Sequence, residues 1–411
     1  MVDKVAALTR FGADTPMGKL LREYWIPALP SSHLVADGVP KRVRLLGEDL
    51  VAFRDTRGVV GILNEACPHR GVSLALGRNE DCGLRCLFHG WKLDVEGRVI
   101  DTPNESAIEG FAERITQVHH PVEEAGGIVW VYLGTQSPPP SRPNLLFTTL
   151  PKDQVFASMG LINANWLPVM EAGFDQAHVR VLHQSSLKET YPNATMTRTM
   201  LSSARTKFEF ERTPYGGRWR FLETSADDPD KEVRVGEFVF PWWDLIGLSA
   251  KTDEDQAILL NVPVDDSHTM LWGIFYNTEH PLEENQPGKV FASAVRSSDT
   301  YRTDLPYDRA SNWGQDREAM RHHWTGIGVG RGNVGLFYED IALMESIQPE
   351  WDRSKQHLGP SDALITRLRH ILLETLREHE AGVIPESVFF DVTSLRPTYS
   401  ERETLAASID G

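Results

Sequence analysis

Two short stretches of the sequence decide the fold of its first third, and they read Cys67-Pro68-His69-Arg70-Gly71 and Cys86-Leu87-Phe88-His89-Gly90-Trp91. Each stretch supplies one thiolate and one imidazole, and a glycine directly follows each histidine. In one class of [2Fe-2S] cluster, two histidines replace two of the four cysteine ligands on one iron. The two stretches together offer that ligand set. They therefore predict a [2Fe-2S] cluster held by Cys67, His69, Cys86 and His89.

The spacing within the two stretches favours this cluster over a structural zinc site. Gly71 and Gly90 would let backbone amides approach cluster sulfurs closely. Structural zinc also takes two cysteines and two histidines, but its usual Cys-x₂₋₄-Cys and His-x₃₋₅-His spacing is not matched by Cys67-x-His69. Four unrelated core residues are a further alternative, although the stretches hold two of only three cysteines in the chain. The third cysteine, Cys82, is given no role.

Length and composition limit the possible functions of the chain. It has 411 residues, of which 41% are hydrophobic, so it can form one large domain or two ordinary ones. A formal net charge of −16 argues against a nucleic-acid binder, which needs an excess of basic residues. The apolar run 127–133 is too short to span a membrane, and Met1-Val2-Asp3-Lys4 lacks the layout of a secretion signal. We therefore expect a cytoplasmic protein that binds neither nucleic acid nor membrane.

Turn and proline signals divide the chain into four segments. Residues 1–30 should form a helical segment, since Thr15 and Pro16 are typical of a helix start. Short apolar stretches broken by turns predict an antiparallel β domain over residues 31–136. A proline-rich linker over residues 137–149 then leads into an α+β domain over residues 150–411. The strongest helical periodicity in that domain covers residues 340–347 and 361–382.

A second group of potential ligands follows the linker. Glu171, Asp175 and His178 have spacings of four and three, which would place them on one helical face. His178 and His183 would lie about 140° apart on an ideal helix, so they can bind one metal only if the helix ends or bulges between them. Two histidines and one remote carboxylate form the facial triad that binds non-haem Fe(II). The alternative is a chance pattern of surface and core residues.

The two groups together resemble the Rieske non-haem iron oxygenases, which are the terminal oxygenase components of aromatic ring-hydroxylating systems. The similarity is strongest to the phthalate dioxygenase branch, whose members have a single kind of subunit. It extends to Tyr338-Glu339-Asp340-Ile341-Ala342-Leu343-Met344-Glu345-Ser346 and to residues 357–362. The resemblance implies an α+β fold, with an N-terminal all-β Rieske [2Fe-2S] domain and a catalytic domain whose antiparallel sheet is helix-grip (START-like).

The same resemblance implies roles for individual residues. An aspartate of the late segment completes the iron triad, and by position this is Asp340, with Asp316 as the main rival. Asp175 matches the family's aspartate that hydrogen-bonds to the first ligand histidine and to a cluster histidine of the neighbouring subunit. Electrons would then cross between subunits of a homotrimer or a dimer of trimers.

The electrons for dioxygen activation should come from another protein. Activation takes two electrons, whereas each cluster carries one at a time. Residues 330–335 fit the Gly-x-Gly-x-x-Gly spacing of a dinucleotide loop, but a single late match without a βαβ context is weak evidence. We therefore expect a separate reductase of the flavin or ferredoxin type, and we interpret residues 326–335 as a loop near the active-site entrance.

Members of the resembling branch act mostly on aromatic carboxylates, and we expect such a substrate here. A carboxylate needs a cationic clamp, for which the candidates are Arg205, Lys207 and Arg234. Gln184 stands where the phthalate enzymes tend to have serine, which departs from the pattern of that substrate. We expect dioxygenation, with a monooxygenase, an O-demethylase or an aryl-ether-cleaving dioxygenase as alternatives. A Rieske electron carrier is the non-enzymatic alternative, although it would need only about a hundred residues.

Overall fold

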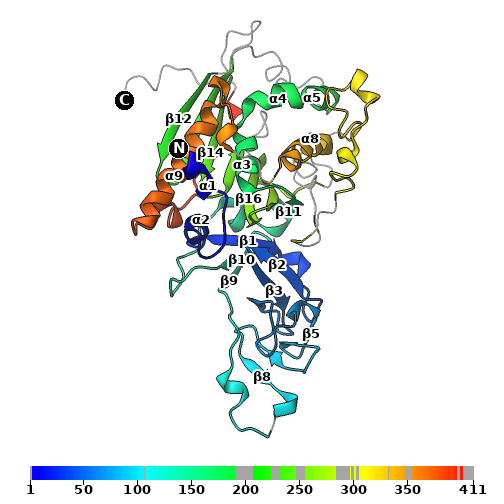
Figure 1. The fold of residues 1–411 in the computed structure, drawn as a ribbon, viewed down its shortest axis with the longest axis vertical. Coiled ribbons are helices and arrows are strands. Elements are labelled where there is room, and N and C mark those ends of the chain that lie inside the picture. The colour runs from blue at the N-terminus through cyan, green and yellow to red at the C-terminus, as the bar shows by residue number, and fades with distance from the viewer. Residues whose placement is uncertain are drawn as a thin grey trace.

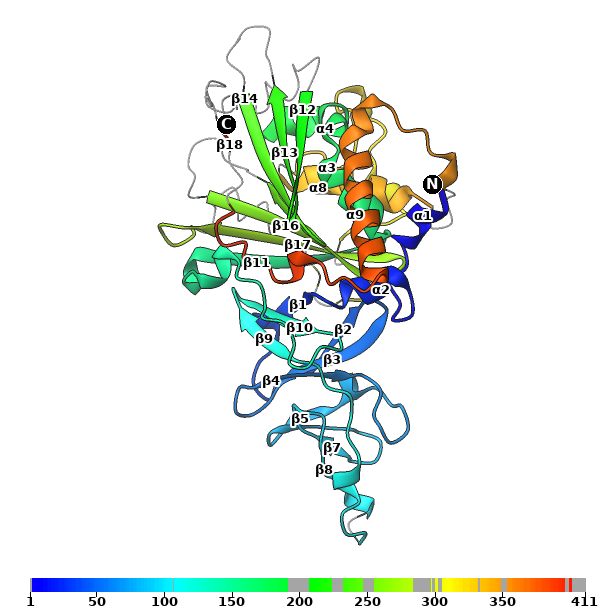
Figure 2. The same ribbon diagram turned by 90° about the vertical axis from the view of Figure 1, so that its left-hand side faces the viewer.

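The computed structural model describes residues 2–105, 107–190, 207–223, 232–246, 255–283, 297, 300–301, 305–331, 333–348, 353–395 and 399–400. The molecule is elongated, with a small β domain at one end and a larger α+β domain at the other (Figures 1 and 2). In the described part of the chain, no helix is both long enough and apolar enough to cross a membrane.

The N-terminal domain consists of three small antiparallel sheets, as the turn pattern predicts. Their strand orders are β1-β10-β9, β2-β3-β4 and β5-β6-β7-β8. The strands are β1 (Trp25–Pro30), β2 (Lys41–Leu45), β3 (Glu48–Arg54), β4 (Val60–Asn64), β5 (Arg78–Glu80), β6 (Gly83–Arg85), β7 (Lys92–Leu93), β8 (Val99–Asp101), β9 (Val122–Ala125) and β10 (Ile128–Tyr132). A separate apolar core that includes Phe53, Leu84 and Trp91 surrounds the two cysteines of the loops.

The first thirty residues are helical only in part. Helices α1 (Val2–Ala7) and α2 (Pro16–Leu21) form, and the Thr15 hydroxyl caps α2 by accepting the Gly18 N–H at 3.1 Å. Residues 25–30 form strand β1 instead of continuing a helix. All six residues of β1 are buried, and they pair with the apolar strand β10. Tertiary pairing therefore overrides the helix predicted for this part of residues 1–30.

The second domain is built on one antiparallel sheet with the order β11-β17-β16-β15-β14-β13-β12. Its strands are β11 (Val155–Ile162), β12 (Lys207–Thr213), β13 (Gly216–Glu223), β14 (Glu232–Val239), β15 (Trp243–Ile246), β16 (Asp255–Asp265), β17 (His268–Asn277) and the short β18 (Tyr399–Ser400), which pairs with β14. Helices cover one face of this sheet (Figure 2). They are α3 (Trp166–Phe174), α4 (Gln176–Leu182), α5 (Gln184–Thr190), α8 (Asn333–Ser346) and α9 (Ala363–Glu380).

Two of these helices differ in extent from the sequence-based expectation. Helix α8 begins at Asn333, so the last three residues of the stretch 326–335 are helical. Helix α9 begins at Ala363 after a 3₁₀ turn over Pro360–Asp362 and ends before Gly382, whose φ is +86°. Its buried face includes Leu364, Leu368, Ile371, Leu372 and Leu376, as the periodicity predicts.

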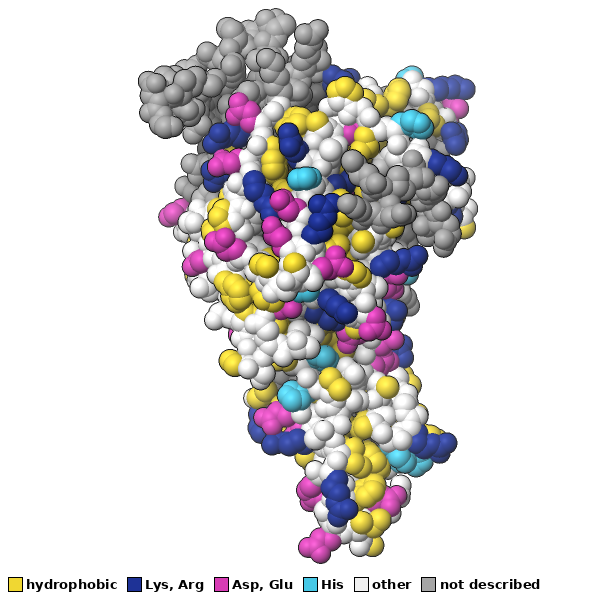
Figure 3. Space-filling view, turned by 60° about the vertical axis from the view of Figure 1, so that its left-hand side comes forward, with side chains coloured by type: hydrophobic (Ala, Val, Ile, Leu, Met, Phe, Trp, Pro, Cys, Tyr) yellow, Lys and Arg dark blue, Asp and Glu magenta, His cyan; other side chains and the backbone are white. Residues whose placement is uncertain are grey.

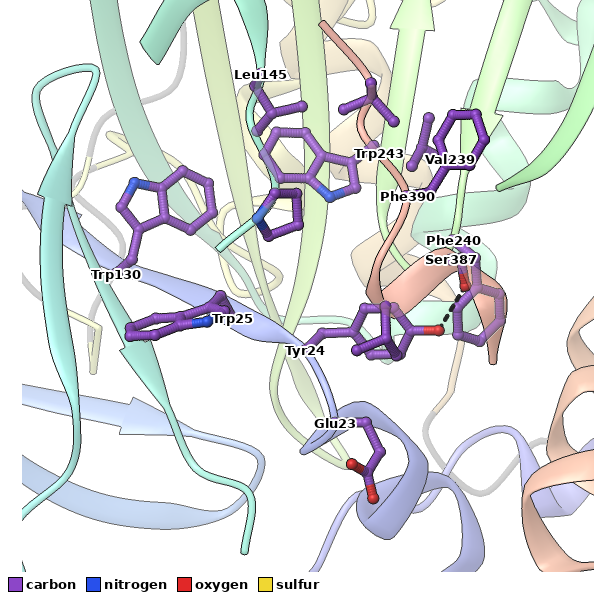
Figure 4. Close-up of a pocket in the computed structure, with 13 residues that line it drawn as sticks. Glu23, Tyr24, Trp25, Trp130, Leu145, Val239, Phe240, Trp243, Ser387 and Phe390 are labelled. Carbon is purple, nitrogen blue, oxygen red and sulfur yellow. Dashed lines mark hydrogen bonds between the residues drawn. The ribbon is translucent and has the colours of Figure 1, made fainter. Parts of the chain in front are cut away.

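Aromatic side chains fill the junction between the two domains (Figure 4). The rings of Trp130 on β10 and Trp243 on β15 stack 5.6 Å apart, and Tyr24 shares a 2.7 Å hydrogen bond with Ser387. The remaining cavity has a volume of about 20 Å³, which is room for about one water molecule. We therefore interpret this junction as structural packing.

A second contact between the domains is polar. Arg44 on β2 donates to the Asp265 carboxylate at the end of β16, with an Nε–Oδ2 distance of 3.0 Å. The backbone N–H groups of Leu46 and Gly47 donate to the carbonyls of Pro263 and Val264 at 3.2 and 2.8 Å. The small β domain is thus fixed to the catalytic sheet by backbone and side-chain bonds together.

Candidate metal centres

The two Cys–His stretches fold into matching loops, one between β4 and β5 and the other between β6 and β7. In the first, the Gly71 N–H donates to the Cys67 carbonyl at 2.8 Å, and in the second the Gly90 N–H donates to the Cys86 carbonyl at 3.0 Å. Both glycines have positive φ, +76° and +77°, which only glycine adopts without strain. Each glycine therefore closes a tight turn that directs the cysteine and histidine of its loop inward.

The four side chains of these loops come together. Cys67 and Cys86 are both 3% exposed, and the rings of His69 and His89 lie 4.4 Å apart at 72°. His69 also stacks on Trp91, with a centroid distance of 4.4 Å. Among the described residues, none hydrogen-bonds to the buried Nδ1 of His69. A buried imidazole nitrogen with a free lone pair suits a metal ligand.

The Cys67 thiol of the first loop is protonated at neutral pH when no metal is bound, because its pKa is raised. Burial raises the pKa of the Cys67 thiol to about 11 and the Cys86 thiol adds to this, although backbone N–H groups of His69 and Arg70 act in the opposite direction. A metal ion binds the thiolate and removes that proton. Two buried thiols beside two adjacent imidazoles fit a Rieske cluster. Cys82 lies outside this group in the β5–β6 turn, where its N–H donates to Thr56 Oγ1 at 2.9 Å.

The second ligand group is assembled by two breaks in the helical chain. Asp175 both ends α3 and caps α4, because its carboxylate accepts the Ala177 N–H at 2.9 Å. Helix α4 ends at Leu182, and His183 adopts a non-helical conformation before α5 begins. The helix thus ends between His178 and His183, which is the condition that their spacing sets for a shared metal.

Asp340 from α8 completes this group. Its Oδ1 lies 3.1 Å from His183 Nε2 and 3.5 Å from His178 Nε2. Potential ligand atoms of His178, His183 and Asp340 all lie within 4.8 Å of one another. Two imidazoles and one carboxylate from two separate helical segments therefore face a common point, and they fit the ligand set of a mononuclear non-haem iron.

The protonation of this group reflects the close approach of opposite charges. Burial lowers the pKa of His178, but the Asp175 and Asp340 carboxylates outweigh it and raise that pKa to about 9. Burial likewise acts against His183, yet Asp340 and Glu339 raise its pKa to about 10. The two histidines hold the pKa of Asp340 well below its ordinary value despite its burial. A divalent cation would take the place of these protons.

The structure separates residues that the sequence spacing groups together. Glu171 does not share a helical face with His178, because the chain breaks at Asp175. Glu171 instead forms two hydrogen bonds of 2.5 and 2.9 Å with Arg369 on α9. Asp175 stays beside His178, with its Oδ2 3.6 Å from His178 Nδ1. Asp316 caps a local turn by accepting the N–H groups of Glu318 and Ala319, both at 2.9 Å.

Two other groups of sequence candidates have different outcomes. Arg205 lies outside the described residues, and the side chains of Lys207 on β12 and Arg234 on β14 are not described either. Gln184 begins α5 and donates to the Val181 carbonyl at 3.0 Å. Trp242 and Trp243, which could have lined an aromatic pocket, are buried in the main core.

A buried carboxylate next to the triad was not identified from the sequence. Glu339 is fully buried, and its Oε2 lies 2.8 Å from His183 Nδ1. Its other oxygen accepts the Thr325 hydroxyl at 2.7 Å. The only available signal was its position directly before Asp340, since carboxylates commonly orient metal-binding histidines.

Comparisons with known proteins agree with both sites. The Rieske [2Fe-2S] domain family matches residues 24–112, and the family described as "LigXa C-terminal domain like" matches residues 131–387. The chain is 35% identical to the 3-chlorobenzoate-3,4-dioxygenase oxygenase subunit of Comamonas testosteroni, over 93% of this chain and 90% of the relative. It is 34% identical to the phthalate 4,5-dioxygenase oxygenase subunit of Pseudomonas putida, over 91% and 86%.

A solved structure supports the fold independently of sequence similarity. Pseudomonas putida CBB5 NdmA superposes with a TM-score of 0.60 at 18% identity, covering 91% of this chain and 96% of that chain. At this identity the likeness concerns the fold alone. The family matches and the two oxygenase relatives go further, and they show that the chain belongs to the Rieske non-haem iron oxygenases, as an oxygenase component of the phthalate dioxygenase type with a [2Fe-2S] cluster and a mononuclear iron.

Proposed function

We propose that this oxygenase component dihydroxylates an aromatic carboxylate with dioxygen and with electrons from a separate flavin- or ferredoxin-type reductase. The substrate class is supported by the relatives, one named for 3-chlorobenzoate and one for phthalate. Both are named dioxygenases. A 26% identical relative is a 5,5'-dehydrodivanillate O-demethylase oxygenase subunit of Sphingobium sp. (strain NBRC 103272 / SYK-6), which makes O-demethylation the second candidate. A cytoplasmic location stays a prediction from the sequence.

The convergence of His178, His183 and Asp340 carries this proposal. These ligands would occupy one side of an Fe(II) ion, and the bound iron supplies the dioxygen activation at its open positions. The remaining work is done by the protein. Glu339 accepts the His183 Nδ1–H, and Asp175 lies beside the Nδ1 of His178, so both rings keep Nε2 directed at the metal point. Cys67, His69, Cys86 and His89 would hold the cluster that delivers electrons.

We further propose that the electrons reach Asp175 from the cluster of a second copy of the chain in a homotrimer or a dimer of trimers. The Rieske strands β5 to β8 and the helices α4 and α8 lie at opposite ends of one chain in both ribbon views (Figures 1 and 2). A cavity of about 430 Å³ adjoins Asp175 and His178, and exposed Trp324, Leu343 and Leu358 contribute to its walls.

The Rieske end offers a complementary surface. Hydrophobic side chains gather at the lower end of the molecule in Figure 3. The exposed apolar residues of this domain include Leu76, Leu87, Phe88, Ile100 and Ile108. Apolar surface of this kind marks interaction sites. Burial of Leu87 and Phe88, which precede the cluster ligand His89, against the cavity of a neighbour would bring a cluster close to Asp175.

Mixed oligomers test transfer between chains. Asp340→Asn removes the iron site and leaves the cluster, whereas His89→Ala removes a cluster ligand and leaves the iron site. We expect each variant alone to be inactive. A co-expressed equal mixture should recover about a quarter of the wild-type rate, the random share of junctions that join an intact cluster to an intact iron site. A mixture as inactive as its parents, with both variants present in one oligomer, would exclude transfer between chains.

The strand register distinguishes between two clamp candidates. Lys207 pairs with Leu222, and Arg234 pairs with Phe221, so the two positions belong to opposite faces of the sheet. Arg234 shares its face with Phe238 of the same strand, and the Phe238 ring contacts Phe174 of α3 at 5.4 Å. The position of Arg234 is therefore on the helix-covered face, which also carries the triad. We propose Arg234 as the carboxylate clamp, and Arg205 stays a candidate from the sequence.

Turnover with a panel of aromatic acids tests the activity directly. Benzoate, phthalate, chlorobenzoate and methoxybenzoate are supplied with a surrogate reductase, and oxygen uptake is compared with product formation. We expect a cis-diol from at least one acid and none from the Asp340→Asn variant. Arg234→Ala should raise the KM for the acid at least tenfold, with Lys207→Ala as the matched control. Formaldehyde from methoxybenzoate alone would favour the demethylase, and a lack of product from every acid would contradict the substrate class.

A further inference from the structure

We propose that the turn of residues 323–327 is a positioning device, in which His323 and Thr325 hold the Glu339 carboxylate and, through it, the ligand His183. This inference rests on the proposed iron ligands but concerns residues outside that set. Four polar residues connected to His183 on the side away from the proposed metal are buried. Their exposed fractions are 0% for Glu339, 2% for His323, 3% for Ser186 and 7% for Thr325. Buried polar groups are costly unless each has a partner.

The two oxygens of Glu339 have different partners. Oε2 accepts a hydrogen bond from His183 Nδ1, and Oε1 accepts one from the Thr325 hydroxyl. The Thr325 Oγ1 itself accepts the Ile327 N–H at 3.1 Å. A hydroxyl has one hydrogen to donate. The Glu339 carboxylate is its nearest acceptor at 2.7 Å, whereas His323 Nδ1 is 3.3 Å away and the Ile327 carbonyl 3.5 Å away, so the hydrogen belongs to the bond with Glu339. Thr325 therefore fixes the rotation of the Glu339 carboxylate.

His323 anchors this turn to the helix that follows His183. The Gly326 N–H donates to His323 Nδ1 at 3.2 Å, so Nδ1 is an acceptor and the ring hydrogen belongs on Nε2. That Nε2 lies 3.3 Å from the Ser186 hydroxyl of α5. Gly326 has a φ of +65°, and a side chain there would clash with the Asp316 carbonyl. The turn therefore requires glycine at position 326 to keep this backbone conformation.

A second serine repeats the attachment. The Trp324 N–H donates to the Ser185 hydroxyl at 2.9 Å. The contacts therefore connect both sides of the site through the backbone of the turn. Thr325 links the turn to Glu339 and so to His183, and the Gly326 N–H links it through His323 to Ser186, which follows His183 by three residues. These links restrain the His183 ring from both α5 and α8, so that its Nε2 stays directed at the metal point without the metal.

Anaerobic Fe(II) titration of the full-length protein tests this device. The protein keeps its cluster but is stripped of the mononuclear iron, and a competing chelator reports the Fe(II) affinity without any turnover. Thr325→Val should weaken that affinity about tenfold or more, the usual size of an effect from a partner behind a metal ligand. Thr325→Ser, which keeps the hydroxyl, should stay within about twofold of wild type.

A matched control separates positioning from general stability. Thr269 is a fully buried threonine on β17 that donates to the Ala164 carbonyl at 2.9 Å. Thr269→Val should cost similar stability and leave the Fe(II) affinity unchanged. Wild-type affinity in Thr325→Val, or an equal loss in Thr325→Ser, would overturn the proposal. If Thr325→Val does not fold, as judged by a missing cluster signal, Ser186→Ala decides: we expect at least threefold weaker binding, and wild-type binding would overturn the proposal.

The same titration keeps this inference distinct from the proposed iron site. If the His183→Ala variant binds Fe(II) like wild type, His183 is not an iron ligand and the proposed iron site is wrong. A His183→Ala variant that loses Fe(II), beside a Thr325→Val variant that does not, would remove only the positioning role.

Discussion

At the scale of single residues, Asp340 contributes the third potential ligand of the proposed iron site. His178 and His183 come from one short stretch of chain, whereas Asp340 reaches them from α8, with its Oδ1 facing both Nε2 atoms. Asp316 is the other aspartate that could have completed the triad, and it is occupied in capping its own turn. These two residues therefore make a matched pair for mutagenesis.

We predict that Asp340→Asn abolishes binding of the mononuclear iron and that Asp316→Asn retains it. Removal of one of three ligands from a non-haem site leaves too few anionic donors for Fe(II). The amide oxygen in Asp316→Asn can still accept the N–H groups of Glu318 and Ala319, so stability should change by less than about 1 kcal/mol, with iron content unchanged. Iron per chain, measured in both purified variants, checks the assignment. Equal iron loss in the two variants, or none in Asp340→Asn, would contradict it.

The raised pKa values of the ligand histidines predict a pH dependence of metal binding. In the metal-free protein, pKa values of about 9 for His178 and about 10 for His183 leave both rings protonated at pH 7. Metal binding needs neutral imidazoles, so protons must leave. The Co(II) affinity should therefore rise between pH 7 and 9, by up to about tenfold per unit for each proton released. Calorimetry in buffers of different ionisation enthalpy counts those protons, and affinity independent of pH would oppose the pKa values.

Most of the proposed ligands could be suggested from the sequence because their spacing is local. Cys67 and His69, Cys86 and His89, and His178 and His183 each lie within one loop or at one helix end. Glu339, Thr325 and His323 are different, because their roles depend on contacts between α8, α5 and a turn that are distant in sequence. No periodicity in a single chain reports such contacts, and only the adjacency of Glu339 to Asp340 hinted at one of them.

At the scale of elements, α8 is the part that carries the long-range chemistry. Its central residues Glu339 and Asp340 face the histidines. Glu345 anchors the C-terminal end of the helix. The Glu345 carboxylate accepts the backbone N–H of Asn163 at 2.9 Å and the Trp313 Nε1–H at 2.8 Å. Glu345 is 5% exposed, so these hydrogen bonds are shielded from water. The helix is thus held at its middle and near its C-terminal end in the orientation that the proposed triad requires.

We predict that Glu345→Gln lowers stability by about 1–3 kcal/mol, because the neutral amide cannot satisfy several buried donors. Glu374→Gln on α9 is the control, since its pair with Arg212 is nearly half exposed. That substitution should cost no more than about 1 kcal/mol. Chemical denaturation of both variants measures the difference. A stability in Glu345→Gln equal to that of the control would show that α8 is oriented by apolar packing alone.

The start of α8 could not be predicted from the sequence. The glycine-rich residues 326–335 are typical of a loop, and the periodicity predicts the helix only from residue 340. Helix α8 begins at Asn333 because Gly335 packs against the backbone of Gly328, where a side chain on Gly335 would lie 2.8 Å from the Gly328 carbonyl oxygen. The glycine thus serves a close tertiary approach inside a helix. The amphipathic periodicity of α9, in contrast, predicted that helix well.

At the scale of the whole molecule, polar contacts hold the Rieske domain to the catalytic sheet. Asp265 is central, since it accepts hydrogen bonds from Arg44 of the other domain and from His268 and the Ser267 N–H of its own. Although burial acts in the opposite direction, these partners hold the pKa of Asp265 well below its ordinary value. The pairing therefore stabilises the folded protein above about pH 4 and is lost as the pH falls toward the folded value.

We predict that Asp265→Asn destabilises the protein by about 1–3 kcal/mol at pH 7 and that this difference shrinks below about pH 4. Glu318→Gln is the matched control, because its pair with Arg321 is about 70% exposed on both sides. It should change stability by less than about 1 kcal/mol. Urea denaturation followed by tryptophan fluorescence at pH 7 and pH 3.5 gives both quantities. A difference that grows on acidification would reverse the sign and refute the stabilising role of the Asp265 carboxylate.

The two metal centres of the whole chain are tested most directly by iron and acid-labile sulfide content together with the reduced-state paramagnetic signal. The wild-type protein should contain about three irons and two sulfides per chain, two of the irons in the cluster and one between His178, His183 and Asp340. His178→Ala should retain about two irons, two sulfides and an unchanged cluster signal. If the wild-type protein contains only two irons per chain and His178→Ala does not change that number, the chain has no mononuclear iron. It would then be an electron carrier and not an oxygenase.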